Sequence, residues 1–309
     1  MTVSALFIGS DSQWDEFAPS LTAEFSTLPF ATDLSRTTSP TEVDYIVMAG
    51  RADSQDFAQF TNCKAILRLW AGVEDVVDNS TITFPICRMV GGGLDAGMVE
   101  WVTAHVMRHH IGMDQHLRQQ NGDWCSNSAP PLASDRRVTI LGLGALGTAC
   151  AQALSGLGFN VTGWSRSLKS VAGIRCLNGP IDDAVAGAEI IVTLLPRTPA
   201  TENALNTKTL ALLAKGAFVI NPGRGELIDD TALLAGLASG QIAHATLDTF
   251  RIEPLPEDHP FWAHPQITVT PHIASATRAA PAAKVIAENI KRGESGAPFL
   301  HVVDRSVGY

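Results

Sequence analysis

Three residues suited to acid–base chemistry follow apolar runs in the second half of the chain. Arg224 lies in "VINPGRGELID", Glu253 in "LDTFRIEPLP" and His272 in "VTPHIAS". Reduction of a 2-keto acid needs a cation for the carboxylate and carbonyl oxygen, and an acid that protonates that oxygen. Arginine suits the first role, histidine suits the second, and a carboxylate beside the histidine would stabilise its protonated form. Taken singly, each could be an ordinary surface or core residue, and spacing alone does not bring them together.

A glycine-rich turn precedes these residues. Gly142, Gly144 and Gly147 form a G-x-G-x-x-G pattern between "RRVTIL", which predicts a strand, and "LGTACAQALSGLG", which predicts a helix. In a dinucleotide site the first glycine permits a tight turn, the second admits pyrophosphate and the third packs helix on strand. The pyrophosphate would lie at the helix N-terminus, where N–H groups favour anions. The alternative is a tight turn that binds no ligand.

The stretch "FNVTGWSRSLKS" follows where NAD-binding proteins place an acid that accepts hydrogen bonds from the ribose 2′-OH. Ser165 stands at about that point, and no acid follows within several residues. A 2′-phosphate would be held by Arg166 with hydroxyl donors from Ser165 and Ser167, and Lys169 would add a point charge. The sequence therefore predicts NADPH over NADH, with a solvated basic loop as the alternative.

Short apolar runs alternate with helix-like stretches along the whole chain. In the first part, "SALFIGS", "VDYIVMAG" and "AILRLWAG" predict strands, and residues 14–24 and 53–60 predict helices. A long helix follows, with Asp95 as its expected cap. A second series runs from "RVTILGLGALG" to "ITVTPHIA", and an alanine-rich helix comes after Pro271. The predicted fold class is α/β, with two doubly wound parallel sheets.

Composition excludes several classes of protein. The formal net charge of −9 argues against a nucleic-acid partner. The cysteines are odd in number and never spaced as CxxC, which favours a reduced cytosolic interior; they are Cys63, Cys87, Cys125, Cys150 and Cys176. No apolar run approaches the roughly 20 residues that span a bilayer. The N-terminal "MTVSALFIGS" lacks the basic region of a signal peptide. We therefore expect a cytoplasmic protein with no membrane partner.

Five motifs then occur in a fixed order: "GLGALG", "LLPRTPAT", "NPGRGELID", "LDTFRIEPLP" and "TPHIAS". Together they resemble the D-isomer-specific 2-hydroxyacid dehydrogenase family over the C-terminal two-thirds of the chain. The resemblance implies a flavodoxin-like substrate-binding domain of residues 1–96 plus 277–309. It implies a Rossmann dinucleotide-binding domain of residues 97–276, with the cofactor in the cleft between them. It also implies NADPH-dependent reduction of small 2-keto acids, glyoxylate or hydroxypyruvate first, and a homodimer formed through the long helix.

The resemblance also implies residue roles. Arg224 would bind and polarise the substrate, His272 would be the general acid and base, and Glu253 would be its partner. In "LWAGVED" the N–H groups of Gly72 and Val73 would grip the substrate carboxylate. The other implied substrate contacts are Trp70, Ala71, Arg224 and His272. The other implied cofactor contacts are Ala145, Leu146, Trp164, Leu195, Pro196, Thr201, Pro222, Gly223, Asp248, His272 and Ala274, with Asp248 near the nicotinamide carboxamide.

Several alternatives stay open. Trp70 stands where small residues are common in the family, and it would either narrow the pocket or pack between lobes. The substrate could be a bulkier 2-keto acid such as phenylpyruvate. A non-catalytic NAD(P)-sensing scaffold is a third possibility, which the intact Arg224, Glu253 and His272 argue against.

Four histidines gather along the expected long helix without an HExxH pattern, so we expect a solvated or interfacial helix face and no metal site. They are His105, His109, His110 and His116.

Overall fold

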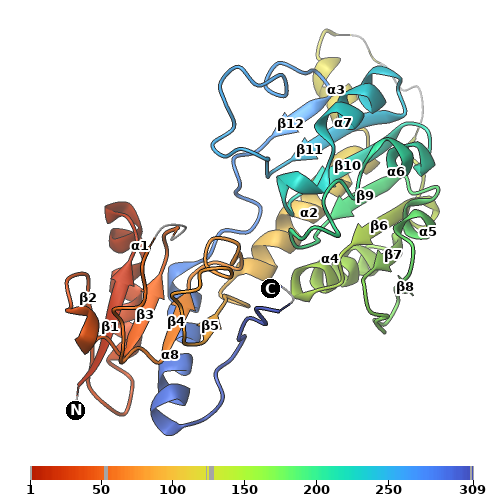
Figure 1. Ribbon diagram of the computed structural model, residues 1–309. Coiled ribbons are helices and arrows are strands. Elements are labelled where there is room, and N and C mark those ends of the chain that lie inside the picture. The colour runs from red at the N-terminus through yellow and green to blue at the C-terminus, as the bar shows by residue number, and fades with distance from the viewer. Residues whose placement is uncertain (1, 52–54, 123, 125–128, 307, 309) are drawn as a thin grey trace. The chain divides into compact units, whose positions relative to one another are not determined.

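The computed structural model of the chain describes residues 2–51, 55–122, 124, 129–306 and 308. The chain divides into two compact units (Figure 1). The first combines residues 1–94 with residues 276–309, and the second is residues 95–275. The end of the chain therefore returns to the unit in which the chain begins. Assigning substrate binding to the first unit and dinucleotide binding to the second stays a prediction at this point.

The first unit is built on a five-stranded parallel sheet of order β2-β1-β3-β4-β5, a flavodoxin-like order. Its two central strands, β3 and β4, are buried along their whole length, as expected where both faces of a parallel sheet are covered. The elements are β1 (Val3–Ile8), α1 (Asp11–Phe25), β2 (Thr32–Ser35), η1 (Pro40–Glu42), β3 (Tyr45–Met48), β4 (Ala65–Arg68), β5 (Ile86–Cys87) and α8 (Ala279–Ser295), and α1 packs against α8.

The second unit contains a seven-stranded parallel sheet of order β12-β11-β10-β9-β6-β7-β8. Its strand order reverses between β6 and β9, where doubly wound sheets bind ligands beyond the carboxyl ends of the strands. Its strands are β6 (Arg137–Leu141), β7 (Asn160–Trp164), β8 (Arg175–Leu177), β9 (Ile190–Thr193), β10 (Ala217–Asn221), β11 (Ile242–Leu247) and β12 (Ile267–Val269). The prediction of two doubly wound parallel sheets is confirmed.

Eight helices accompany this second sheet in the described residues between 94 and 275, and the longest, α2, begins at the last residue of the first unit. Met98, Val102 and Val106 on α2 are buried against the sheet. The helices are α2 (Leu94–His110), α3 (Met113–Arg118), η2 (Ala133–Asp135), α4 (Ala145–Gly156), α5 (Ile181–Val185), α6 (Thr207–Leu212), η3 (Gly225–Leu227) and α7 (Asp230–Ala238).

Two local predictions are wrong. Residues 55–60 of the expected helix at 53–60 form a turn and irregular backbone, and residues 53 and 54 lie outside the described residues. Phe57 and Phe60 are buried there, and the Phe57 N–H donates to the Thr81 hydroxyl at 2.9 Å, so contacts distant in sequence replace helical ones. The long helix begins at Leu94, which places Asp95 in its first turn rather than at its cap.

Of the expected solvated or interfacial histidine face, the solvated alternative is wrong for two histidines of α2. His109 and His110 are 3% and 7% exposed, because α2 lies against the second sheet. The His109 ring stacks on Phe218 at 4.7 Å, and its Nε2 lies 2.9 Å from the Thr246 hydroxyl. Burial lowers the pKa of His109 to about 3. His116 lies on the separate helix α3, where it is exposed.

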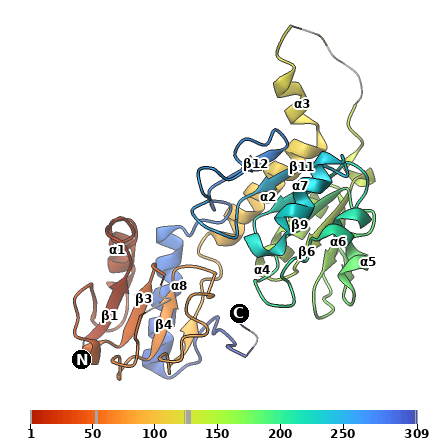
Figure 2. The same cartoon turned by 45° about the horizontal axis from the view of Figure 1, so that its top comes forward.

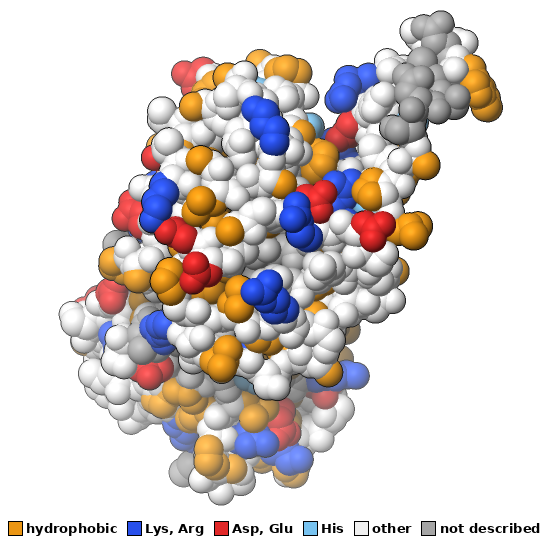
Figure 3. All heavy atoms as spheres, turned by 90° about the vertical axis from the view of Figure 1, so that its right-hand side faces the viewer, with side chains coloured by type: hydrophobic (Ala, Val, Ile, Leu, Met, Phe, Trp, Pro, Cys, Tyr) orange, Lys and Arg blue, Asp and Glu red, His pale blue; other side chains and the backbone are white. Residues whose placement is uncertain are grey.

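Among the described residues, no group of three or more His, Cys, Asp or Glu could hold a metal ion, and no helix is long and apolar enough to cross a membrane. On the face shown in Figure 3, the visible Lys and Arg side chains are interspersed with Asp and Glu side chains. This face does not resemble the continuous basic stripe that tracks a nucleic-acid backbone.

The turn from β6 into α4 depends on two glycines. Gly142 has a φ of 111°, in the left-handed region that side chains disfavour. A Cβ on Gly147 would lie 1.7 Å from the carbonyl oxygen of Gly142. The first turn of α4 therefore lies directly on the backbone that leaves β6, which allows α4 to begin at the edge where the sheet reverses.

Replacing Gly147 with alanine is expected to lower the free energy of unfolding by about 2 kcal/mol or more, because backbone must shift to admit the methyl group. Gly156→Ala, at the other end of α4, is the matched control, since no atom lies within 4 Å of its Cβ position. It should be neutral or stabilise by up to about 1 kcal/mol. Urea unfolding followed by fluorescence measures both, and equal unfolding midpoints would contradict the account.

Candidate active site

His272 and Glu253 meet at the carboxyl edge of the second sheet. The Nδ1 atom of His272 lies 2.8 Å from Oε2 of Glu253. The side chains are 51% and 33% exposed, so the pair is open to a ligand on one side. The strands that carry them pair in parallel, with Leu247 of β11 opposite Val269 of β12. The loops that follow these strands therefore start side by side, and residues far apart in sequence come together.

The carboxylate of Asp248 shapes the segment that carries His272. Asp248 is 1% exposed, and its Oδ1 accepts hydrogen bonds from the Thr270 hydroxyl at 2.6 Å and the Ile273 N–H at 2.9 Å. Its Oδ2 accepts from the Ala274 N–H at 2.9 Å, and its own carbonyl accepts from the His272 N–H at 2.8 Å. His272 is held with a φ of 54°, in the left-handed region. This shaping role was not predicted from the sequence, where its signal is an acid directly after a buried strand.

The charge of Glu253 is set by its neighbours. Burial by itself would raise the pKa of this carboxyl, but several contacts outweigh burial. These are the hydrogen bond with His272, the Phe250 N–H donated to Oε1 at 2.9 Å, and the charges of His272 and Arg224. The pKa of Glu253 therefore lies below its ordinary value of 4.5, and the carboxylate is ionised at neutral pH.

Arg224 follows β10 at the same edge of the sheet. The Asn221 side-chain amide donates to the Arg224 carbonyl at 2.9 Å and accepts from the Gly223 N–H at 3.1 Å, so this one residue shapes the turn. A Cβ on Gly225 would lie 2.0 Å from the carbonyl carbon of Phe250, which shows how closely this turn approaches the loop of Glu253. The structure thus brings Arg224, Glu253 and His272 to one edge of the sheet, which their spacing in the sequence alone did not establish.

The N-terminus of α4 has the form of an anion site. Gly144 caps the helix without any side-chain hydrogen bond, and no atom lies within 4 Å of the position its Cβ would take. The backbone at Ala145, Leu146 and Gly147 forms the first turn of this twelve-residue helix. Its N–H groups have no intrahelical acceptor and favour an anion in the open space.

The predicted 2′-phosphate segment follows β7. Arg166, Ser167 and Lys169 are exposed there, whereas Ser165 is 8% exposed. The Ser165 hydroxyl donates to the Ser167 carbonyl at 2.7 Å, which tightens the turn. The Trp164 indole N–H donates to the Gly179 carbonyl at 3.1 Å. The Ser165 side chain therefore stabilises the turn. The exposed side chains of Arg166 and Lys169 carry the positive charge of this segment.

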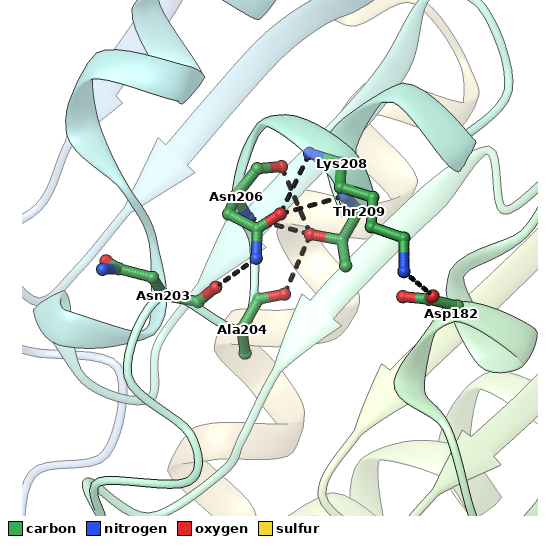
Figure 4. Close-up of polar contacts among 6 residues, drawn as sticks. All are labelled: Asp182, Asn203, Ala204, Asn206, Lys208 and Thr209. Carbon is green, nitrogen blue, oxygen red and sulfur yellow. Dashed lines mark hydrogen bonds and ion pairs between the residues drawn. The ribbon is translucent and has the colours of Figure 1, made fainter.

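The segment after β9, which includes Leu195, is fixed by its own side chains. The Thr201 hydroxyl donates to the Pro196 carbonyl at 2.7 Å. Further along, Asn206 caps α6 by accepting from the N–H groups of Lys208 and Thr209, and its amide donates to the Asn203 carbonyl at 3.0 Å (Figure 4). This end of the predicted cofactor segment therefore has a defined backbone.

The remaining predicted substrate residues lie in the first unit, where Trp70, Ala71, Gly72 and Val73 follow β4. The Trp70 carbonyl accepts from the Met89 N–H at 3.0 Å, and the Gly72 carbonyl accepts from Arg68 at 3.3 Å. Arg68 was not among the residues predicted from the sequence.

Glu253→Gln is expected to lower the melting temperature at pH 7 by roughly 1–3 °C. A carboxyl with a lowered folded pKa stabilises the protein above its unfolded pKa, and this stability is lost as pH falls through the folded pKa. The difference from the wild type should therefore shrink below pH 4.5. Glu257→Gln, an exposed change in the same loop, is the control and should stay within about 1 °C. A difference that persists unchanged in acid would contradict the pairing.

Comparison with known proteins gives a consistent result. Residues 101–274 match the family model described as D-isomer specific 2-hydroxyacid dehydrogenase, NAD binding domain. A glyoxylate/hydroxypyruvate reductase A from Serratia proteamaculans is 38% identical over 257 residues, which cover 80% of this chain and 82% of that relative. A Yersinia enterocolitica protein of the same name is 35% identical over 80% of this chain and 82% of that relative.

Solved structures agree with the sequence relatives. A D-isomer specific 2-hydroxyacid dehydrogenase from Xanthobacter autotrophicus Py2, in complex with NADPH and MES, has a TM-score of 0.91 at 36% identity over 100% of both chains. An NADPH-dependent glyoxylate/hydroxypyruvate reductase from Sinorhizobium meliloti, in complex with NADP and sulfate, has a TM-score of 0.86 at 28% identity, covering 100% of this chain and 99% of the other. The chain therefore belongs to the D-isomer specific 2-hydroxyacid dehydrogenase family.

Proposed function

We propose that this protein reduces small 2-keto acids with NADPH, converting glyoxylate to glycolate and hydroxypyruvate to D-glycerate. The observation that carries the proposal is the 2.8 Å contact between His272 and Glu253, with Arg224 at the same edge of the sheet. The family supplies the class of reaction. Relatives named glyoxylate/hydroxypyruvate reductase, with 35–38% identity to this chain, support the choice of substrate.

The residues present fit the proposed cofactor. The open space before Gly144 and the first turn of α4 suit a pyrophosphate, and exposed Arg166 with Ser167 suits a 2′-phosphate. Three similar solved structures are described as complexes with NADPH or NADP, which supports the same choice here. When bound, NADPH supplies the hydride for the keto carbon. The other proposed cofactor contacts are Gly142, Ala145, Leu146, Gly147, Trp164, Ser165, Lys169, Leu195, Pro196, Thr201, Pro222, Gly223, Asp248, His272 and Ala274.

The side chains then divide the remaining chemistry. Glu253 holds Nδ1 of His272 and stabilises the imidazolium, which leaves Nε2 to donate its proton to the substrate's carbonyl oxygen. Arg224 binds the carboxylate and offsets negative charge that develops on that oxygen. Gly72 and Val73 hold the carboxylate through their N–H groups. A C–H bond forms at the keto carbon and an O–H bond at its oxygen, so the products are the 2-hydroxy acid and NADP⁺.

We also propose a homodimer in the cytoplasm. Large apolar side chains are exposed on and beyond α3, which support association in this region; they are Leu117, Trp124 and Leu132. Figure 2 shows α3 extending away from the sheet of the second unit. The four described cysteines are free, as a reducing compartment favours; they are Cys63, Cys87, Cys150 and Cys176, whereas Cys125 lies outside the described residues.

Initial rates of NADPH oxidation with glyoxylate, hydroxypyruvate, pyruvate and phenylpyruvate test the proposed activity. We expect the first two to react fastest, and His272→Asn to lower kcat/KM by roughly 10²–10⁴-fold because the proton donor is lost. His301→Asn is the matched control, since His301 is also exposed and also has a left-handed backbone, with a φ of 57°. Asparagine tolerates that conformation at both sites, so the comparison isolates the imidazole.

The rates also separate the alternatives. Faster turnover of phenylpyruvate would favour the bulkier substrate class. Absence of turnover with any keto acid, together with retained NADPH binding, would favour the scaffold. Equal losses for His272→Asn and His301→Asn would contradict the role of His272.

Arg166→Asp tests the cofactor preference. An acid at this position repels a 2′-phosphate, so the ratio of kcat/KM with NADPH to kcat/KM with NADH should fall by at least about tenfold. Arg175→Asp, on the neighbouring strand β8, makes the same change in net charge and should leave the ratio within about twofold. An unchanged ratio in Arg166→Asp would mean that the segment is only a solvated basic loop.

A further inference from the structure

The carboxyl end of β4 carries a largely buried ion pair, in which the Asp75 side chain is 9% exposed. Arg68 is 1% exposed, and its two terminal nitrogens donate to the two carboxylate oxygens of Asp75 at 2.9 and 2.8 Å. Removing two charges from water is costly, and such a pair adds little stability over apolar side chains of the same size. The pair therefore calls for an explanation beyond packing, and the turn that it encloses, residues 69–75, provides one.

Arg68 contacts this turn at two points. Its Nη2 donates to the Gly72 carbonyl at 3.3 Å, and its guanidinium carbon lies 5.4 Å from the centroid of the Trp70 ring. The backbone is held independently, because the Trp70 carbonyl accepts from the Met89 N–H and the Leu69 carbonyl accepts from the Thr277 hydroxyl. A planar, always charged guanidinium suits both contacts, since it stacks on an aromatic face and donates in a fixed fork.

The contact with Gly72 also sets the direction of the next amide. The Gly72 carbonyl and the Val73 N–H belong to one planar peptide unit and point in opposite directions. Because the carbonyl is turned towards Arg68, the Val73 N–H is turned away from it. That N–H is one of the two groups proposed to hold the substrate carboxylate. Arg68 thus fixes both this donor and the indole ring two residues before Gly72.

We propose that Arg68, locked by Asp75, is a positioning residue that makes Trp70 a fixed wall selecting 2-keto acids with small side chains. The inference rests on the proposed function, because it assigns Trp70 to the substrate that Gly72 and Val73 hold. When the ring moves aside from the buried guanidinium, it loses this cation–π contact. A large substrate side chain would therefore meet the ring, whereas glyoxylate, which has none, would not.

The test compares kcat/KM for glyoxylate with kcat/KM for phenylpyruvate, and the dissociation constant of NADPH is measured alongside. Trp70→Ala removes the indole ring. The double variant Arg68→Met, Asp75→Leu removes the ion pair that holds the ring, and it leaves no buried charge unpaired. Matched controls are Trp14→Ala and Arg36→Met. Arg36 lies 5.7 Å from the Trp14 ring and is paired with Asp11, so the same residue types meet on α1 away from the turn.

Trp70→Ala should raise the phenylpyruvate-to-glyoxylate ratio by roughly 10–100-fold, the scale of discrimination by pocket size. The double variant should raise the same ratio. It should also raise KM for glyoxylate about tenfold, because the Val73 N–H is no longer held in the direction of the substrate carboxylate. Its kcat should change less. NADPH binding should stay within about twofold in both. The two control variants should leave the ratio unchanged.

An unchanged phenylpyruvate-to-glyoxylate ratio in Trp70→Ala would refute the role of Trp70 as a wall of the pocket. An unchanged ratio and KM in the folded double variant would overturn the positioning role; if that variant does not fold, Arg68→Lys replaces it, because lysine keeps the charge and loses the fork. A wild-type enzyme that reduces no 2-keto acid would refute the proposed function itself, and this is seen before any variant is compared.

Discussion

The backbone between β12 and Ala274 folds around the carboxylate of Asp248. This fold of the backbone brings the His272 ring to Glu253. Three donors converge on that buried carboxylate, and the Asp248 carbonyl accepts the N–H of His272. The resulting left-handed backbone at His272 turns the ring towards the neighbouring loop. Asp248 directly follows the last residue of β11. The position of the imidazole is therefore fixed relative to the sheet.

The same arrangement recurs in simpler form at two other strand ends, one in each unit. Asn221, the last residue of β10, shapes the turn of Arg224, and Arg68, the last residue of β4, shapes the turn of Gly72. In each case a buried polar side chain at a strand end satisfies the backbone of the turn that follows. Residues proposed to touch the ligand are thereby supported by buried side chains at the strand ends, which is how a site keeps its geometry.

Much of this could be predicted from sequence because parallel strands end at one edge. The apolar runs located the strands, and Arg224, Glu253 and His272 followed three of them. The failures have a different cause. The helix expected at 53–60 is replaced by contacts with Thr81, and His109 is buried because α2 turns that face to the sheet. Neither fact is local to the sequence. Arg68 was overlooked for the same reason, since its burial depends on strands and turns that come together only in the fold.

The central claim is that the imidazolium of His272, stabilised by Glu253, donates the proton. The most direct measurement is kcat/KM for glyoxylate at saturating NADPH in the wild type, in Glu253→Gln, in His272→Asn and in the double variant. Because Glu253 acts through its 2.8 Å contact with His272, the double variant should lose no more activity than His272→Asn alone. Losses that multiply in the double variant would contradict the claim, because Glu253 would then affect the rate without acting on the proton donor.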